Sequence, residues 1–322
     1  MSLARFPAMS SPTPAVAVVI ISYNGEAFLP TSIASVLNQT VTDLELVVVE
    51  DGTHDSAEQI VKSFNDPRVR YVWRENGGTS AGRNTGIGAT TAPLIAFLDC
   101  DDWWDPRKLE TQLAALAARP DAGVVYSAAT MVVEGTAERW IDPAVVEGDA
   151  MPQLMLRNCI SGSASSVMMK RSMIDQVGRF DESLRYAEDW EYWLRLAKAT
   201  PYARVEEPLV FIRARPGSLG RHTDNLRRGA HQVINRAYAN TERKYRRLRH
   251  VAHANIEFGA SLDLSHHGRR RDAMIPLLRA IGYDPFRLMF WRRLILMVLS
   301  KIWPTQSMRR RIVTAESTET PL

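Results

Sequence analysis

Short apolar runs that alternate with helical patterns constrain the fold of this chain more than any other feature. Three of these runs are residues 16–21, 44–49 and 94–98, and the first two are rich in β-branched side chains. This is the pattern of strands that are covered on both faces. Between the first two runs, apolar residues recur at helical spacing over residues 28–37. Strands that alternate with helices predict a doubly wound, mixed but mostly parallel α/β sheet.

Polar side chains follow three of the predicted strands directly. Ser22 and Tyr23 follow the first strand, Asp51 follows the second, and Asp99 follows the run that ends at Leu98. Ligands of open α/β sheets bind at the carboxyl ends of the strands. These side chains are therefore expected to contribute to one site.

The acidic cluster is the strongest chemical signal in the sequence. Asp99, Asp101 and Asp102 lie within four residues of one another, and crowded carboxylates repel unless a partner neutralises them. A hard divalent cation, Mg²⁺ or Mn²⁺, is the expected partner, with phosphate oxygens and waters as its other ligands. The alternative is an acidic turn with Asp105 as a helix N-cap, but a cap needs only one carboxylate.

Two further segments suit a nucleotide, although each also has a purely structural interpretation. Asp51 could accept a hydrogen bond from a base or ribose edge, or it could simply form a turn and a helix cap. Residues 76–84 place small residues and Arg83 at a predicted helix start, where they could hold a diphosphate or form a surface loop with a structural arginine. No Walker A motif is present, and residues 86–89 lack the third glycine of the dinucleotide fingerprint.

A pair of acids, Glu188 and Asp189, precedes an apolar helical pattern. Acids in this position commonly cap a helix or favour its N-terminal dipole. The functional alternative is a general base, a carboxylate that takes the proton from an attacking hydroxyl group.

Charge and cysteine content limit the setting of the protein. The formal net charge is +4, and arginine clusters gather in the last third, at residues 243–247, 269–271 and 309–311. Such clusters suit anionic partners, although each could be an ordinary solvated helix face. No nucleic-acid-binding module accompanies them, so no nucleic-acid partner is expected. Two cysteines form no disulfide framework, which favours a reducing, cytoplasmic compartment.

Changes in composition and in apolar pattern along the sequence predict three regions. Residues 1–14 are rich in Ser and Pro and are expected to be disordered, residues 15–222 form the catalytic domain, and residues 223–322 form a helical region. Helices are expected in that region at 231–264, 270–281 and 286–303. The last is amphipathic with several arginines, which suits either docking on a membrane surface or burial against the catalytic domain. No run reaches the length of a membrane span.

The ordered set of motifs resembles that of family 2 glycosyltransferases. The motifs are Ile21-Ser22-Tyr23-Asn24, Asp51-Gly52-Thr53 with Asp55, Ala81-Gly82-Arg83-Asn84, Leu98-Asp99-Cys100-Asp101-Asp102 and Glu188-Asp189-Trp190. The resemblance covers about residues 15–218 and rests on order and spacing rather than on any single motif. It implies a GT-A fold, a nucleotide-diphosphate sugar as donor and inversion at the anomeric carbon.

The resemblance also implies a role for each matching residue. Donor binding falls to Ser22, Tyr23, Asp51, Arg83 and Asp99, metal binding to Asp101 with Asp99, and catalysis to Asp189 with Glu188 in support. Tyr23 and Asp51 would contact the base, and Asp99 the ribose. The loop at residues 161–166 would border the donor sugar and the acceptor. One departure is Arg215, which stands where relatives often carry a histidine.

The sequence therefore predicts an inverting, metal-assisted glycosyltransferase whose acceptor is a glycan or a lipid-linked glycan, acting peripherally at the inner face of a membrane. Two alternatives stay open. A nucleotidyltransferase that makes nucleotide sugars would need a basic, Gly-rich triphosphate loop, which residues 22–25 do not supply. A non-catalytic scaffold that binds glycan or lipid would have no use for Asp101 and Asp189.

Overall fold

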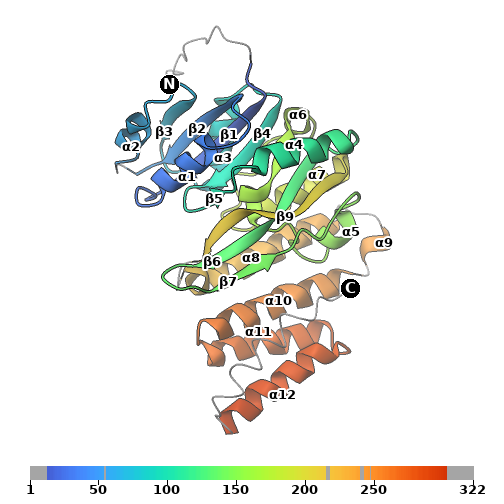
Figure 1. The fold of residues 1–322 in the computed structure, drawn as a ribbon. Coiled ribbons are helices and arrows are strands. Elements are labelled where there is room, and N and C mark those ends of the chain that lie inside the picture. Colours follow the sequence, from blue (N-terminus) through green and yellow to red (C-terminus); the bar gives the residue numbers. More distant parts are fainter. Residues whose placement is uncertain (1–12, 54–55, 215–217, 240–242, 247, 303–322) are drawn as a thin grey trace. The chain divides into compact units, whose positions relative to one another are not determined.

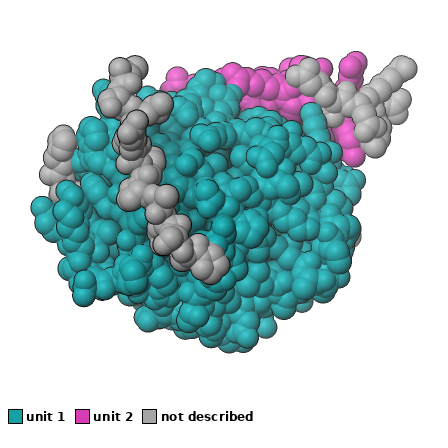
Figure 2. Space-filling model, turned by 90° about the horizontal axis from the view of Figure 1, so that it is seen from above, with its two compact units in different colours: residues 1–216 teal, residues 217–322 magenta. Residues whose placement is uncertain are grey.

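The computed structural model describes residues 13–53, 56–214, 218–239, 243–246 and 248–302. The chain divides into two compact units, residues 1–216 and 217–322, which Figure 2 colours separately. Most of the segment predicted to be disordered, residues 1–12, lies outside the described part. That residues 15–222 form the catalytic domain stays a prediction.

The first unit consists of a sheet and the helices that cover it (Figure 1). Its strands are β1 (Val16–Ser22), β2 (Leu44–Asp51), β3 (Val69–Arg74), β4 (Leu94–Asp99), β5 (Trp103–Trp104), β6 (Val124–Val133), β7 (Arg139–Asp142), β8 (Met168–Lys170) and β9 (Tyr202–Ala214). Its helices are α1 (Leu29–Leu37), α2 (Ala57–Ser63), α3 (Thr79–Gly88), α4 (Lys108–Ala118), α5 (Met151–Leu154), the 3₁₀ helix η1 (Ser163–Ser166), α6 (Arg171–Val177) and α7 (Glu188–Ala199).

The sheet is mixed, in the order β3-β2-β1-β4-β8-β6-β9-β5, with β7 paired to β6. Strands β3, β2, β1 and β4 are mutually parallel, whereas β8 runs antiparallel to both β4 and β6. The predicted α/β architecture with a mixed sheet and parallel strands is confirmed. Its parallel half contains the strands whose ends were predicted to form the site.

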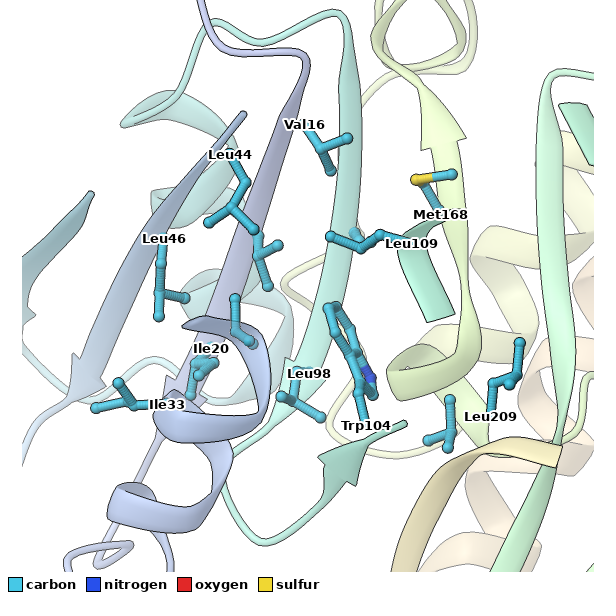
Figure 3. Packing of buried hydrophobic residues seen from close by; sticks show 14 of the residues in the cluster. Val16, Ile20, Ile33, Leu44, Leu46, Leu98, Trp104, Leu109, Met168 and Leu209 are labelled. Atoms are coloured by element: carbon cyan, nitrogen blue, oxygen red, sulfur yellow. The ribbon is translucent and has the colours of Figure 1, made fainter. Parts of the chain in front are cut away.

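Helices cover both faces of the parallel half, as the apolar strands predicted. Val16, Val18 and Ile20 of β1 point into a core formed with α1, α2 and α4 (Figure 3). The alternate residues of β1 meet α3, where a Cβ added to Gly82 would lie 2.8 Å from Cγ2 of Ile21. Glycine therefore lets α3 approach the strand closely, which brings the next residue, Arg83, to the end of the sheet.

The second unit is helical among its described residues. Its elements are α8 (Ser218–Ala239), α9 (Arg243–Arg246), α10 (Arg249–His266), α11 (Arg270–Tyr283) and α12 (Leu288–Ile302). A small core forms where α10, α11 and α12 meet, around Ala254, Leu277 and Phe290. None of the described helices combines the length and the apolar character needed to cross a membrane.

The helix predicted over residues 231–264 is wrong as one element. The chain ends α8 at Ala239 and begins α10 at Arg249, and α10 packs against α8. A continuous helix would hold His231 and His253 about 33 Å apart. In the structure their ring centroids are 4.9 Å apart. The break therefore brings the two helices side by side, where they form hydrogen bonds with each other. A helical periodicity in the sequence cannot predict such bonds.

Candidate active site

The strand register gathers the predicted polar residues at one edge of the sheet. Ser22 of β1 lies opposite Glu50 of β2, and Ile21 lies opposite Asp99 of β4. Asp51 is the last residue of β2 and pairs with Arg74 of β3. Ser22, Asp51 and Asp99 thus occupy the carboxyl ends of three neighbouring parallel strands.

Arg83 connects this edge to the helix that carries the predicted base. Its guanidinium is buried, with Nη2 donating to Oδ1 of Asp99 at 3.1 Å and Nη1 donating to Oε1 of Glu188 at 3.1 Å. Burial alone would lower the pKa of Arg83, but the charges of Asp99, Glu188 and Asp189 outweigh it and raise that pKa. The side chain ties α3, β4 and α7 together as a permanent cation.

The Nε of Arg83 is buried and has no hydrogen-bond partner in the part of the chain that the structure describes. A buried guanidinium that leaves one donor unused is costly in a purely structural role. Its orphaned N–H is therefore compatible with a ligand oxygen, as the diphosphate interpretation of Arg83 requires.

Asp102 differs from its two neighbours in the acidic cluster because it faces inward. Its Oδ2 accepts a hydrogen bond from Oγ of Ser165 at 2.6 Å, and its Oδ1 accepts one from the main-chain N–H of Arg213 at 3.1 Å. Burial, followed by the charges of Asp99 and Asp101, raises the pKa of Asp102 well above its usual range. The raised pKa of Asp102 favours its neutral form, and together with the charge of Arg83 this relieves part of the repulsion that the sequence predicted.

Asp99 and Asp101 remain as the partly exposed carboxylates of the cluster. Among the described residues, no three His, Cys, Asp or Glu side chains are grouped so that they could hold a metal ion by themselves. Mg²⁺ commonly uses only one or two protein carboxylates and takes its other oxygens from substrate phosphates and water. The residues present fit a cation that is bound together with a diphosphate.

Asp51 organises the loop between β3 and α3. Its carboxylate accepts hydrogen bonds from Nη1 of Arg74, from the N–H of Gly77 at 3.0 Å and from the N–H of Gly78 at 2.7 Å. The N-cap residue of α2, Ser56, makes no side-chain capping hydrogen bond, and the carboxylate of Asp51 bonds to the loop before α3 rather than to α2. Residues 76–78 form a loop before α3, as one interpretation of residues 76–84 predicted. Arg83 lies within α3 and is buried rather than on the surface.

Ser22 and Tyr23 lie next to each other but in different environments. Ser22 is fully buried, and its hydroxyl has no hydrogen-bond partner within the described ranges. The ring of Tyr23 is 57% exposed at the same edge of the sheet. An exposed aromatic ring beside strand ends is available to a planar ligand.

Asp189 stands at the start of α7, and three donors hold its carboxylate. Ser163 donates its Oγ–H at 2.9 Å and Asn158 its Nδ2–H at 3.1 Å, both to Oδ2, while the N–H of Trp190 donates to Oδ1 at 2.7 Å. The last of these bonds joins neighbouring residues in the first turn of α7, whose N-cap residue, Ala187, makes no side-chain capping hydrogen bond. Two bonds come from the chain before α7, so they orient the carboxylate.

Glu188 faces the opposite direction, toward Arg83. Burial raises the pKa of Glu188, the charge of Arg83 lowers it, and the charge of Asp189 raises it again, so that the pKa lies above the usual range. The neighbouring acids therefore differ in environment, with Glu188 joined to the Arg83 network and Asp189 held by neutral donors.

Sequence reasoning missed two residues of this site and located a third only by region. Asn158 carries no motif, and Arg213 contributes its main-chain N–H to Asp102 while its guanidinium lies over the rings of Phe28 and Trp103. Ser163 falls in the loop that was expected to border the donor sugar. Arg215, the noted departure from the family pattern, lies outside the described residues.

Comparisons with known proteins agree with this geometry. The sequence profile described as "Glycosyl transferase family 2" matches residues 17–178. An uncharacterized glycosyltransferase of Rickettsia conorii is 30% identical over 205 residues, which is 61% of this chain and 33% of the relative. An uncharacterized glycosyltransferase of Rickettsia prowazekii is 26% identical over 204 residues, 62% of this chain and 63% of the relative. The chain thus spans between one third and just under two thirds of these curated relatives.

Solved structures show the same fold at low identity. The crystal structure of S. aureus TarS 1–349 in complex with UDP-GlcNAc has a TM-score of 0.61 and 17% identity, covering 82% of this chain and 81% of that one. The mannosyltransferase PcManGT from Pyrobaculum calidifontis, in complex with GDP-Man and Mn²⁺, has a TM-score of 0.55 and 17% identity, covering 92% and 89%. The predicted GT-A fold is therefore confirmed.

Proposed function

Because this chain belongs to glycosyltransferase family 2, we propose that it transfers a sugar from a nucleotide-sugar donor to a hydroxyl group of an acceptor. The observation that carries the proposal is the link from sheet edge to helix: Arg83 joins Asp99 at the end of β4 to Glu188, and Asp189 is the next residue. A donor-binding edge and an oriented carboxylate are thereby held in one rigid network. The neighbours that contain UDP-GlcNAc or GDP-Man support the class of donor.

The nucleotide would lie along the ends of β1, β2 and β4. Tyr23 offers an exposed ring to the base. Among the described residues only the N–H of Gly78 donates to Oδ2 of Asp51, which leaves a lone pair for a base N–H. Ser22 has an unpaired buried hydroxyl beside them. Asp99 would face the ribose while it keeps its hydrogen bond to Arg83.

The leaving diphosphate carries the charge that grows during transfer. Asp101, with Asp99 as a second ligand, would hold a divalent cation there, and when bound the cation supplies positive charge that stabilises the departing nucleoside diphosphate. Arg83 adds a fixed, buried cation, and its Nε–H, which has no partner among the described residues, can donate to a phosphate oxygen. Since the cation takes most of its ligands from the diphosphate, we expect it to bind weakly without nucleotide.

Asp189 would deprotonate the acceptor. Its three donors fix the orientation of the carboxylate that would take the proton. The acceptor oxygen then attacks the anomeric carbon, the bond to the diphosphate breaks on the opposite face, and the proton moves to Asp189. A single displacement of this kind inverts the anomeric centre.

The membrane partner is proposed from an apolar surface on the second unit. Trp291, Ile295, Val298 and Leu299 of α12 are all exposed, and their spacing places them along one side of the helix. Phe290 on another side of α12 is buried in the small core. Exposed Arg279 and Arg292 make an anionic lipid surface the occupant that fits. The acceptor would then be a lipid-linked glycan at the cytoplasmic face of a membrane.

Vesicle flotation tests the membrane proposal. The double variant Ile295→Ser, Leu299→Ser should lose most of its binding to vesicles that contain phosphatidylglycerol. Leu226→Ser removes an exposed apolar residue from α8 instead and should bind as the unchanged protein does. Equal flotation of all three proteins would overturn the membrane proposal and leave the proposed transfer reaction untouched.

The donor proposal is tested by thermal unfolding in a panel of nucleotide sugars with and without Mn²⁺. One nucleotide sugar should raise the melting temperature only when the cation is present, because a ligand that binds only the folded state stabilises it by mass action. Asp101→Asn should abolish this cation-dependent shift, whereas Asp105→Asn, a neighbouring acid outside the site, should retain it. A panel in which no nucleotide sugar stabilises the protein would contradict the proposed function.

A further inference from the structure

The second unit contains an open hollow that the proposed function does not use. Its volume is about 620 Å³, and it is lined by His231, Asn235, Arg249, His250, His253 and Tyr283. These residues come from α8, α10 and α11, so the hollow lies entirely within this unit. Among the described residues none that lines the hollow is a carboxylate, and Arg249 contributes a positive charge.

Three stacked rings form its floor. The ring centroids of His231 and His253 are 4.9 Å apart, those of His253 and Tyr283 are 5.2 Å apart, and neighbouring planes differ by 27° and 26°. His253 is only 7% exposed although it lines the hollow. The rings are therefore fixed by packing rather than free to rotate.

A chain of hydrogen bonds fixes which ring nitrogens remain for a ligand. Arg227 donates to Oε1 of the buried Glu257 at 2.8 Å, and Nε2 of His231 bonds the same oxygen at 2.9 Å. Because a carboxylate only accepts, His231 carries a proton on Nε2. Its Nδ1 is shared with Nδ1 of His253 at 2.7 Å, so Nε2 is the nitrogen that His253 can present to the hollow.

The rim adds donors that converge on the same space. Arg249 uses Nη2 to bond Oδ1 of Asn235 at 2.7 Å, which leaves the amide nitrogen of Asn235 and the other guanidinium N–H groups. Arg249 is also the first residue of α10, an 18-residue helix with no side-chain cap and no acid in its first turn. The first N–H groups of a helix lack partners within it and favour an anion.

We propose that this hollow binds a phosphate group, carried by a small molecule or by a lipid headgroup. A phosphate presents acceptor oxygens in several directions and carries negative charge, which matches a guanidinium, an amide, imidazole nitrogens and a helix N-terminus around one space. The proton between the two Nδ1 atoms sets the role of His253: its Nε2 donates to the phosphate when that proton lies on His231, and accepts from a phosphate hydroxyl when it lies on His253. The site does not depend on the transfer reaction.

The test follows the imidazole Cε1–Hε1 NMR signals of the full chain during titration with inorganic phosphate, with chloride holding the ionic strength constant. The signals of His231, His250 and His253 should shift and saturate. Arg249→Gln should weaken the affinity by at least about tenfold, the effect of losing a charge-assisted hydrogen bond. Arg271→Gln removes the same charge from an exposed site in α11 and should leave the affinity unchanged.

Absence of saturable shifts, or equal weakening in the two variants, would overturn the proposal. If the three rings only packed α8 against α10, replacing Arg249 would not change how the imidazole signals respond to phosphate. Competition by glycerol 3-phosphate and by vesicles of phosphatidic acid separates the two sources. Displacement by the soluble ester supports a small-molecule phosphate, displacement by vesicles supports a headgroup, and displacement by neither rejects phosphate esters as ligands.

Discussion

Each compact unit buries one charged side chain between two partners, and the two buried charges have opposite signs. In the first unit the cation Arg83 lies between Asp99 and Glu188. In the second unit the anion Glu257 lies between Arg227 and His231. Buried ion pairs contribute little net stability, although removing one partner is costly. Both networks therefore suggest a use beyond folding.

The surplus charge around each network differs. Asp189 also lies near Arg83, and Asp101 belongs to the same acidic cluster as Asp99, so these surroundings are acidic, which suits a divalent cation and a proton acceptor. Arg249 and His250 lie near the Glu257 network and make that hollow rich in donors, which suits an anion. In both units the buried ion and the groups around it therefore have opposite charges: acids surround the cation Arg83, and cationic or donor groups surround the anion Glu257.

The largest expected difference between the networks is catalytic. Asp189→Asn should reduce sugar transfer roughly 10²–10⁴-fold, the usual contribution of a general base, while donor binding is retained. Glu257→Gln, which breaks the other network, should leave the transfer rate unchanged. Both rates are measured as release of nucleoside diphosphate that depends on acceptor. A rate near that of the unchanged protein in Asp189→Asn would remove Asp189 from the role of base.

The next difference concerns two buried carboxyl groups. Burial raises the pKa of Asp102, whereas burial acting on Glu257 is outweighed by hydrogen bonds from His231 and Arg227, which lower the pKa of Glu257. Asp102→Asn, which introduces a neutral amide, should therefore lower the free energy of unfolding by about 1 kcal/mol or less. Glu257→Gln should cost about 2 kcal/mol, because hydrogen bonds to a charged acceptor are lost.

Urea unfolding of the two variants measures these costs, and each variant has its alanine counterpart as a control for lost packing. Equal destabilisation by Asp102→Asn and Glu257→Gln would show that the two carboxyl groups have the same charge state, and the contrast between the networks would then fail.

An effect similar in size to the cost of Glu257→Gln is a pH dependence of the second unit. Burial, His231 and Arg249 lower the pKa of His253 to about 4. Between pH 6.5 and pH 4 the unfolded chain therefore binds more protons at this residue than the folded chain. Stability is lost as the pH falls through this window, by about 2 kcal/mol. Amide exchange in α10, measured in the full chain, should quicken accordingly, and His253→Asn should flatten the dependence.

Some of this architecture follows from local sequence, and some does not. The strands β1, β2 and β4 are apolar runs that end in polar residues, so their ends and the position of Asp99 could be predicted. The inward orientation of Asp102 could not, because Ser165 and Arg213 are distant in the chain. Asn158 was missed for the same reason. No periodicity reports that residues 22 apart, His231 and His253, become neighbours when α8 ends.

The hydroxyl of Ser165 has a consequence for how the first unit responds to a bound ligand. It donates to Asp102 and accepts from the main-chain N–H of Asp99, so its rotation is locked from both sides. The short helix η1 that carries it also carries Ser163, which contacts Asp189. Any displacement of η1 beside Asp189 must therefore pull on the turn that carries Asp102. The short helix is thus a mechanical linkage between the end of β4 and the start of α7.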